Sequence, residues 1–314
     1  MKSMIEQTNA GYRAGFIAVV GRPNVGKSTL INALLGQKIA AVSPKPQTTR
    51  KIQLGILTLE NAQAVLMDTP GIHKPVHKLG EYMNDTALDT LEDADVILWL
   101  VDASVKPTEE DEIVASRLAA SKSKPPVLMA INKVDLISGG ALDENQAAYQ
   151  DLLPAAIPIR ISAMNGFEIK TLVDELVKRL PEGEAFYSEE QITDLYERDI
   201  AAELVREAAL LHLRDEVPHS LAVRIDEFQE RGDAGAYLAA TLLVERDSQK
   251  GIVIGKGGEM LKAIGSTARR EIEKMSDRKV FLELRVKVNK NWRNDPFVLN
   301  LLGYVSEKKK KKKK

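Results

Sequence analysis

The stretch Gly21-Arg22-Pro23-Asn24-Val25-Gly26-Lys27-Ser28 decides the fold of the N-terminal part of this chain. It matches the pattern G-x-x-x-x-G-K-[ST], in which backbone N–H groups wrap phosphates, the lysine reaches the β/γ oxygens and the hydroxyl ligates Mg²⁺. An apolar run at residues 16–20 precedes the stretch, and a helical pattern at residues 27–35, which includes Thr29, follows it. A strand, a glycine loop and a helix in this order predict a phosphate-binding loop.

Apolar runs alternate with helical patterns along the first half of the chain. The expected strands cover residues 52–59, 62–67, 96–101, 127–131 and 157–161, and the expected helices cover 110–120, 141–152 and 168–180. A turn at Glu60-Asn61 joins the first two runs as a hairpin, whereas the last three runs are apolar enough for buried parallel strands. This alternation predicts an α/β fold, a doubly wound mixed sheet with its ligand at the carboxyl ends of the strands.

Two motifs after expected strands indicate which nucleotide is bound. Asp68-Thr69-Pro70-Gly71 stands where a Mg²⁺-linked carboxylate and a γ-phosphate-sensing glycine N–H belong. In Asn132-Lys133-Val134-Asp135, the Asp135 carboxylate can accept hydrogen bonds from guanine N1–H and N2–H₂, which adenine lacks. Asn132 would tie the loop together, the Lys133 stem would pack on the base, and Ser162-Ala163 can supply a backbone N–H to guanine O6. The sequence therefore predicts a GTP/GDP and Mg²⁺ site.

The position after Gly71 bears on the rate of GTP hydrolysis. It is Ile72, where Ras-like enzymes carry the glutamine that orients the attacking water, so slow intrinsic turnover is expected. Asn24 is the type of residue that ligates a K⁺ ion between the phosphates in related GTPases, although it could simply shape the loop. The residues expected to serve catalysis are Lys27, Thr49, Asp68, Gly71 and Asn24.

A second domain is expected beyond the linker Pro181-Glu182-Gly183-Glu184. The expected division is residues 1–184, then 185–307, then a disordered tail of seven lysines at 308–314. The second part shows, in order, a helix at 193–213, strands at 221–228 and 237–244, a helix, a glycine loop, a helix and a strand at 280–288. This order predicts an α+β domain.

The glycine loop Gly255-Lys256-Gly257-Gly258, preceded by Ile254, is the candidate nucleic-acid site. The helix after it carries an apolar stripe, and Lys262, Arg269, Arg270 and Lys274 lie away from that stripe. Residues 246–293 hold 13 basic and 6 acidic side chains, which favours a polyanionic partner. The alternative is a helix-capping loop beside solvated charges.

The motifs of this chain resemble those of the Era family of GTPases. They are the phosphate loop, D-T-P-G at residues 68–71, N-K-V-D at 132–135 and I-S-A at 161–163, together with Gln47-Thr48-Thr49-Arg50. The resemblance implies that the last segment lies in switch I, where Thr48 or Thr49 ligates Mg²⁺, and both stay open. It also implies a type II KH domain that binds single-stranded RNA, a partner in 16S rRNA near its 3′ end, and a role in maturation of the small (30S) ribosomal subunit. Contact with the inner membrane surface is implied too, whereas the lysine tail departs from the family's usual ending.

Composition and missing features limit the alternatives. The chain has no cysteine, no signal-like apolar start and no apolar run long enough for a membrane span, so we expect a cytoplasmic protein. A monomer is also expected. Asp135 disfavours a kinase or ATPase, the missing cysteine disfavours a tRNA-modifying GTPase, and a double GTPase would need a second phosphate loop. A GTP-gated RNA-binding scaffold with little hydrolysis, or a GTPase acting on another RNA, stays open.

Overall fold

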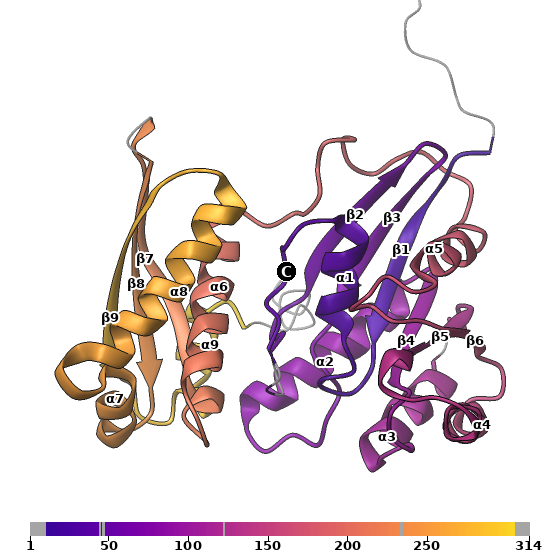
Figure 1. Ribbon diagram of the computed structural model, residues 1–314, viewed down its shortest axis with the longest axis horizontal. Coiled ribbons are helices and arrows are strands. Elements are labelled where there is room, and N and C mark those ends of the chain that lie inside the picture. The colour runs from indigo at the N-terminus through magenta and orange to yellow at the C-terminus, as the bar shows by residue number, and fades with distance from the viewer. Residues whose placement is uncertain (1–10, 44, 46–47, 122, 233–234, 305–314) are drawn as a thin grey trace, which may run out of the picture. The chain divides into compact units, whose positions relative to one another are not determined.

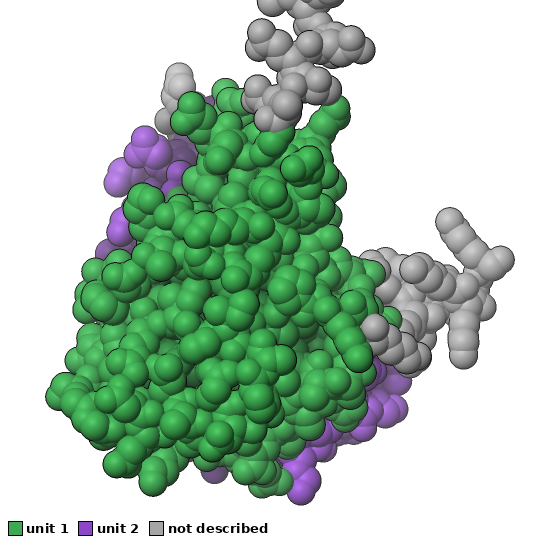
Figure 2. All heavy atoms as spheres, turned by 90° about the vertical axis from the view of Figure 1, so that its right-hand side faces the viewer, with its two compact units in different colours: residues 1–36, 52–73, 86–194 green, residues 37–51, 74–85, 195–314 purple. Residues whose placement is uncertain are grey.

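The computed structural model of this chain describes residues 11–43, 45, 48–121, 123–232 and 235–304. They form two compact units, coloured separately in Figure 2. The first unit comprises Met1–Gly36, Ile52–His73 and Thr86–Asp194, and the second Gln37–Lys51, Lys74–Asp85 and Leu195–Lys314. Two segments from the N-terminal half therefore group with the C-terminal part, whereas the expected domain boundary after residue 184 stays a prediction. Gln47 and the lysine tail lie outside the described residues.

A six-stranded sheet in the order β2-β3-β1-β4-β5-β6 forms the centre of the first unit (Figure 1). Its strands are β1 (Arg13–Val20), β2 (Gln53–Leu59), β3 (Ala62–Asp68), β4 (Val96–Asp102), β5 (Val127–Asn132) and β6 (Ile157–Arg160). Only β2 runs antiparallel to its neighbour, because a tight turn joins it to β3. The doubly wound mixed sheet is confirmed.

Helices cover both faces of this sheet (Figure 1). They are α1 (Lys27–Leu35), α2 (Lys78–Asp93), of which Thr86–Asp93 belong to this unit, α3 (Glu109–Ala119), α4 (Gly140–Leu152) and α5 (Ile169–Val177). Side chains of α2, α3 and α4 pack with alternate strand residues into one apolar core, in which Trp99 meets Tyr149 edge-on with ring centroids 6.4 Å apart. This core holds the strand ends that carry the predicted motifs.

The structure corrects two expectations in the first unit. The run at 157–161 was expected as a buried strand, but β6 is an edge strand whose first residue, Ile157, is 39% exposed. Helix α2 was not predicted, although Leu79, Met83, Ala87 and Leu91 are buried at a spacing of four. Polar residues and a glycine between these positions lower the helical propensity of the segment and hid the pattern.

The second unit contains a three-stranded sheet in the order β7-β8-β9 with helices on it (Figure 1). Its elements are α6 (Glu197–His212), β7 (Ala222–Glu230), β8 (Ala236–Val244), α7 (Asp247–Ile254), α8 (Glu259–Ser276), β9 (Val280–Val288) and α9 (Pro296–Leu301). Strands β7 and β8 are antiparallel, and β8 and β9 are parallel. The predicted apolar stripe of α8 packs with α6 and the sheet, with Ile264, Ala268 and Ile272 buried. The expected α+β order is confirmed.

The helix expected at 193–213 begins later, at Glu197. The residues before it hydrogen-bond to β2 instead, because Ile56 N donates to Ile192 O and Thr193 pairs with Gly55. Helix α9 was not predicted, and short 3₁₀ helices cover Val134–Leu136, Pro218–Ser220, Lys256–Gly258 and Trp292–Asn294. Among the residues described, no helix combines the length and apolar character that crossing a membrane requires.

Candidate nucleotide site and glycine loop

The phosphate loop connects β1 to α1 at the carboxyl end of the central strand. Gly26 adopts φ 105°, and a Cβ there would meet Asn132 Nδ2 at 2.4 Å. The loop can therefore close only around a glycine, because both its backbone conformation and the approach of Asn132 exclude a side chain. Asn24, the candidate K⁺ ligand, also has a positive φ of 64°.

Lys27 lies inside this loop. Its side chain is buried, and Nζ donates hydrogen bonds to the carbonyl oxygens of Gly21 and Arg22, both at 3.0 Å. Burial of the ammonium lowers the pKa of Lys27 to about 8, against partial compensation by Asp68. A negatively charged phosphate beside this ammonium would offset the cost of burying it.

Ser28 and Asp68 bring together the oxygen groups expected around Mg²⁺. Ser28 Oγ donates to Asp68 Oδ2 at 2.9 Å, and Asp68 is fully buried at the end of β3. Mg²⁺ prefers such oxygen ligands but usually keeps waters and substrate phosphates as well. Accordingly, the described residues contain no group of three acidic, histidine or cysteine side chains that could hold a metal alone.

The D-T-P-G loop touches the phosphate loop. A Cβ on Gly71 would meet Pro23 N at 2.9 Å, so a glycine is needed for this approach. Thr69 Oγ1 donates to Val19 O at 2.7 Å and fixes the start of the loop beside β1. Ile72 was expected among the nucleotide contacts, but its side chain is buried in the apolar core, which leaves only its backbone for that role.

The guanine motifs form one connected loop system. Asn132 Nδ2 donates to Val25 O at 2.8 Å, and Asn132 Oδ1 accepts from Ala163 N at 2.9 Å. Ser162 Oγ donates to Asp135 Oδ1 at 2.5 Å. One asparagine thus links the phosphate loop to the loop after β6, and Asp135 is held by a neighbour on that second loop.

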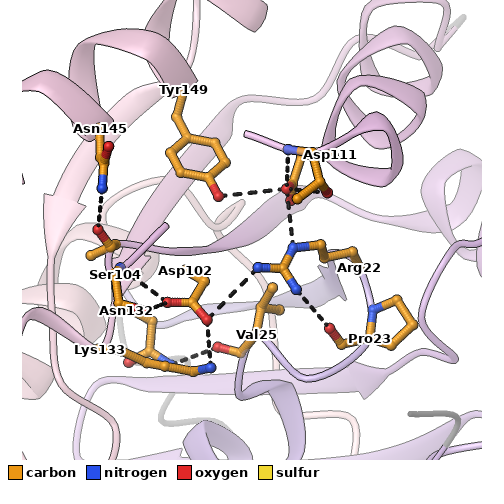
Figure 3. A network of polar contacts seen from close by, with 12 residues as sticks. Arg22, Pro23, Val25, Asp102, Ser104, Asp111, Asn132, Lys133, Asn145 and Tyr149 are labelled. Carbon is orange, nitrogen blue, oxygen red and sulfur yellow. Dashed lines mark hydrogen bonds and ion pairs between the residues drawn. The ribbon is translucent and has the colours of Figure 1, made fainter. Parts of the chain in front are cut away.

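Arg22 and Lys133 meet two carboxylates that sequence reasoning did not single out (Figure 3). Arg22 Nε donates to Asp111 Oδ2 at 3.0 Å, and Lys133 Nζ donates to Asp102 Oδ2 at 2.6 Å. Asp102 ends β4, between the strands that carry the phosphate and guanine loops. Its position at the carboxyl end of a parallel strand was the signal that could have identified it.

The switch I candidates group with the second unit. Thr48 Oγ1 donates to Lys45 O at 2.8 Å, Thr48 O accepts from Arg206 Nη2, and Thr49 is buried. The fully buried Arg50 donates to Leu221 O at 2.7 Å. Which of the two threonines would ligate Mg²⁺ stays an open prediction.

The glycine loop of the second unit joins α7 to α8 on the surface. Gly257 and Gly258 have φ 60° and 84°, and no atom lies within 4 Å of a Cβ built on either. The open loop therefore leaves room for a close-lying ligand backbone. The basic side chains expected around it are exposed, at Lys256, Lys262, Arg269, Arg270 and Lys274, and Ile254 is half-buried.

Two family descriptions match separate parts of the chain. Residues 16–133 match the family described as 50S ribosome-binding GTPase, and residues 216–293 match the KH domain. The first range contains the phosphate loop, and the second contains the glycine loop. The fold and the site geometry of both parts agree with these descriptions.

Similarity to individual proteins extends over nearly the whole chain. GTPase Era of Ruminiclostridium cellulolyticum is 48% identical over 95% of this chain and 99% of that protein, and GTPase Era of Geobacter metallireducens is 49% identical over 94% and 98%. A crystal structure of Era with MgGDPNP and nucleotides 1506–1542 of 16S ribosomal RNA has a TM-score of 0.89 and 41% identity, and covers 94% of this chain and 100% of that one.

A second solved structure, an Aquifex aeolicus Era variant bound to GDP·AlF4⁻, is 41% identical with a TM-score of 0.88 and covers 94% of this chain and 100% of that chain. Fold, motifs and full-length similarity thus agree, and the chain is a GTP-hydrolysing enzyme that belongs to the Era family of GTPases, with a C-terminal KH domain.

Proposed function

We propose that this GTPase binds the 3′ end region of 16S rRNA through its KH domain and acts in maturation of the small ribosomal subunit. The observation that carries the proposal is the likeness over 94% of the chain to an Era structure that holds both MgGDPNP and that RNA. The open glycine loop and its exposed basic side chains support it from this chain itself. The alternative is that this GTPase acts on another RNA. Comparing its affinity for the 16S fragment with that for an unrelated RNA distinguishes the two.

Different residues of the first unit would contact different parts of GTP. We assign the backbone of residues 21–29 to the phosphates, and Lys27 to the β/γ oxygens. Asp135 would read guanine N1–H and N2–H₂, with Ser162-Ala163 beside guanine O6. Contacts from Thr69, Pro70, Gly71 and the Ile72 backbone would complete the γ-phosphate side.

Mg²⁺ fits the oxygen set found here. Ser28 Oγ, Asp68 and one of the two switch I threonines, Thr48 or Thr49, would hold it. Bound there, the ion would neutralise charge on the phosphate oxygens. Ser28 Oγ and Asp68 Oδ2 lie 2.9 Å apart, which supports their assignment to one ion.

We propose that Asn24 holds a K⁺ ion, which supplies the positive charge that an arginine finger supplies in other GTPases. Asn24 is exposed on the phosphate loop and has a positive φ, and the buried, apolar Ile72 side chain cannot orient water. We expect faster GTP hydrolysis in KCl than in NaCl, and loss of that difference in Asn24→Ala. Asn61→Ala, at the exposed hairpin turn, is the control. Equal rates in both salts would reject K⁺ assistance.

The RNA site can be tested by one glycine pair. Gly257→Asp places a carboxylate where phosphates would lie and should weaken binding of the 16S 3′-end RNA by about tenfold or more. Gly232→Asp is a matched control, because Gly232 also has a positive φ, 53°, and open space in the same unit. GTP binding should be unchanged in both. Equal RNA affinity of the two variants would refute the site.

Nucleotide and RNA sites are coupled, in our proposal, through the segment 37–51. Near the end of this segment, Arg50 donates to Leu221 O and Thr48 O accepts from Arg206. Near its start, Lys38 forms ion pairs with Glu207 of α6 at 2.7 Å and with Glu271 of α8 at 2.8 Å. A threonine that turns toward Mg²⁺ pulls on these contacts, which lead to the helix after the glycine loop. GTP binding would thereby change the RNA affinity.

Peripheral contact with an anionic membrane is the remaining part of the proposal. Phe297 and Leu301, one turn apart on α9, are 76% and 59% exposed, and the sequence ends in seven lysines at 308–314. An apolar pair with a polybasic stretch provides the two signals that stable membrane binding requires. Sedimentation with anionic but not zwitterionic vesicles, lost when residues 308–314 are removed, is the expected result. Equal sedimentation with both vesicle types would contradict it.

A further inference from the structure

Arg22 of the phosphate loop points into the protein. Its Nε donates to Asp111 Oδ2 at 3.0 Å, Nη1 donates to Pro23 O at 3.3 Å, and Nη2 lies 3.7 Å from Asp102 Oδ2 (Figure 3). The Asp111 side chain is completely buried and that of Arg22 is 14% exposed. Two carboxylates and a carbonyl therefore occupy the guanidinium, so Arg22 does not serve as a free cation for the phosphates.

Asp102 is shared between the two halves of the nucleotide site. Its Oδ2 accepts from Lys133 Nζ at 2.6 Å while it faces Arg22, and its Oδ1 accepts from Ser104 N and Oγ at 3.0 and 2.6 Å. Arg22 belongs to the phosphate loop, and Lys133 to the guanine loop. One carboxylate at the end of β4 thus contacts both loops through charged groups.

Asp111 anchors the same network to α3. Its Oδ2 also accepts from Thr108 N at 3.0 Å and Thr108 Oγ1 at 2.8 Å, and Tyr149 O–H approaches it at 3.5 Å. The capping box at the start of α3 therefore fixes the carboxylate that holds Arg22. A rigid helix end is a firmer support for a loop side chain than another loop.

The charges of the network balance, which explains why it tolerates burial. Burial opposes the charge of Arg22, yet Asp111 and Asp102 raise the pKa of its guanidinium. Burial likewise opposes the charge of Asp102, but hydrogen bonds from Lys133 and Ser104 lower the pKa of this carboxyl. Removing one charged member of the network would therefore leave a buried opposite charge without its partner.

We propose that Asp102 and Asp111 are positioning residues, which act through Lys133 and Arg22 to lock the guanine loop and the phosphate loop into one rigid nucleotide-binding frame. The frame sets how long the nucleotide stays bound. This inference rests on the proposed roles of the two loops. It gives Arg22 a structural task, not a catalytic one.

The test is the dissociation rate of a fluorescent GDP analogue from the full chain. Asp102→Asn keeps the size and the Ser104 contacts but loses the charge, and should accelerate dissociation on the order of 10- to 100-fold, as for other groups that orient a ligand-binding side chain. Asp143→Asn is the matched control, because Asp143 forms an exposed ion pair with Arg160 in the same unit. It should leave the rate unchanged.

A double-mutant cycle separates positioning from loss of stability. Asp102→Asn and Lys133→Met should accelerate GDP dissociation non-additively, because each breaks the same contact. Preference for GDP over XDP should be kept, since Asp135 is untouched. A merely structural role would lower the melting temperature without this coupling. Asp111→Asn should accelerate GDP dissociation as well, and if this variant does not fold, the Asp102 and Lys133 cycle alone decides the test.

Two failures are distinguishable. If the wild-type chain does not bind GDP, the proposed nucleotide site itself is wrong. The positioning inference is overturned, and the nucleotide site stands, if the wild-type chain binds GDP but either of two results is found. One is a GDP dissociation rate of Asp102→Asn within about twofold of wild type, and the other is an additive effect of Asp102→Asn and Lys133→Met on that rate.

Discussion

At the scale of single residues, the buried Lys27 shows how the phosphate loop prepares for its ligand. Among the described residues, its ammonium donates hydrogen bonds to the backbone carbonyls of Gly21 and Arg22. Burial of this cation costs free energy that Asp68 offsets only in part, and a phosphate beside it would offset more of that cost. Nucleotide binding and the protonation of Lys27 are therefore linked.

This linkage predicts how GDP affinity depends on pH. The pKa of Lys27 is lowered to about 8 in the structure, and bound phosphates raise it, so binding above this pH takes up a proton. GDP affinity should then fall as the pH rises from about 7 to about 9.5. Titration calorimetry in buffers of different ionisation enthalpy measures both the affinity and the proton uptake. A flat affinity without proton uptake would contradict the linkage.

From the sequence, site residues could be predicted only where they lie in a local sequence pattern. The phosphate loop, Asp68, Asn132 and Asp135 could be singled out as candidates because each motif is contiguous and follows a strand. Asp102 and Asp111 could not be assigned in this way, because their partners Arg22 and Lys133 are brought to them only by the parallel packing of β1, β4 and β5.

At the scale of elements, the errors fall where long-range contacts outweigh local preference. The segment before α6 reads as helix but pairs with β2, and β6 reads as a core strand but ends the sheet. Strand pairing and edge position depend on neighbours far away in sequence, which a periodicity cannot report. The long alternating pattern of strands and helices, in contrast, was sufficient for the sheet.

Helix α9 offers a stability test at this scale. The Asp295 side chain caps it by accepting from Phe297 N and Val298 N, and Val298 and Leu299 pack into the cluster around Trp292. Asp295→Ala should lower the free energy of unfolding of the second unit by about 1 kcal/mol. Denaturant unfolding followed by tryptophan fluorescence in a Trp99→Phe background, in which Trp292 is the remaining tryptophan, measures it, with the exposed Asn300→Ala as control. Equal stabilities of the two variants would show that the cap contributes nothing.

At the scale of the whole molecule, the chain is divided differently in space and in sequence. Two parts were predicted, and two compact units are found, but residues 37–51 group with the unit that holds the glycine loop. This segment carries the two switch I candidates for Mg²⁺, Thr48 and Thr49, and Lys38 of the same segment forms ion pairs with α6 and α8. No local pattern encodes this grouping, because it depends on ion pairs with residues more than 160 positions away.

The measurement that tests the central claim most directly is the affinity of the full chain for a 16S 3′-end RNA fragment in two nucleotide states. If one of the switch I threonines ligates Mg²⁺ in the GTP state, as we propose, RNA binding with a non-hydrolysable GTP analogue and Mg²⁺ should differ several-fold from that with GDP. By thermodynamic reciprocity, bound RNA should change the ratio of the affinities for the GTP analogue and for GDP by the same factor. Equal RNA affinity in both nucleotide states would contradict a GTP-controlled RNA switch.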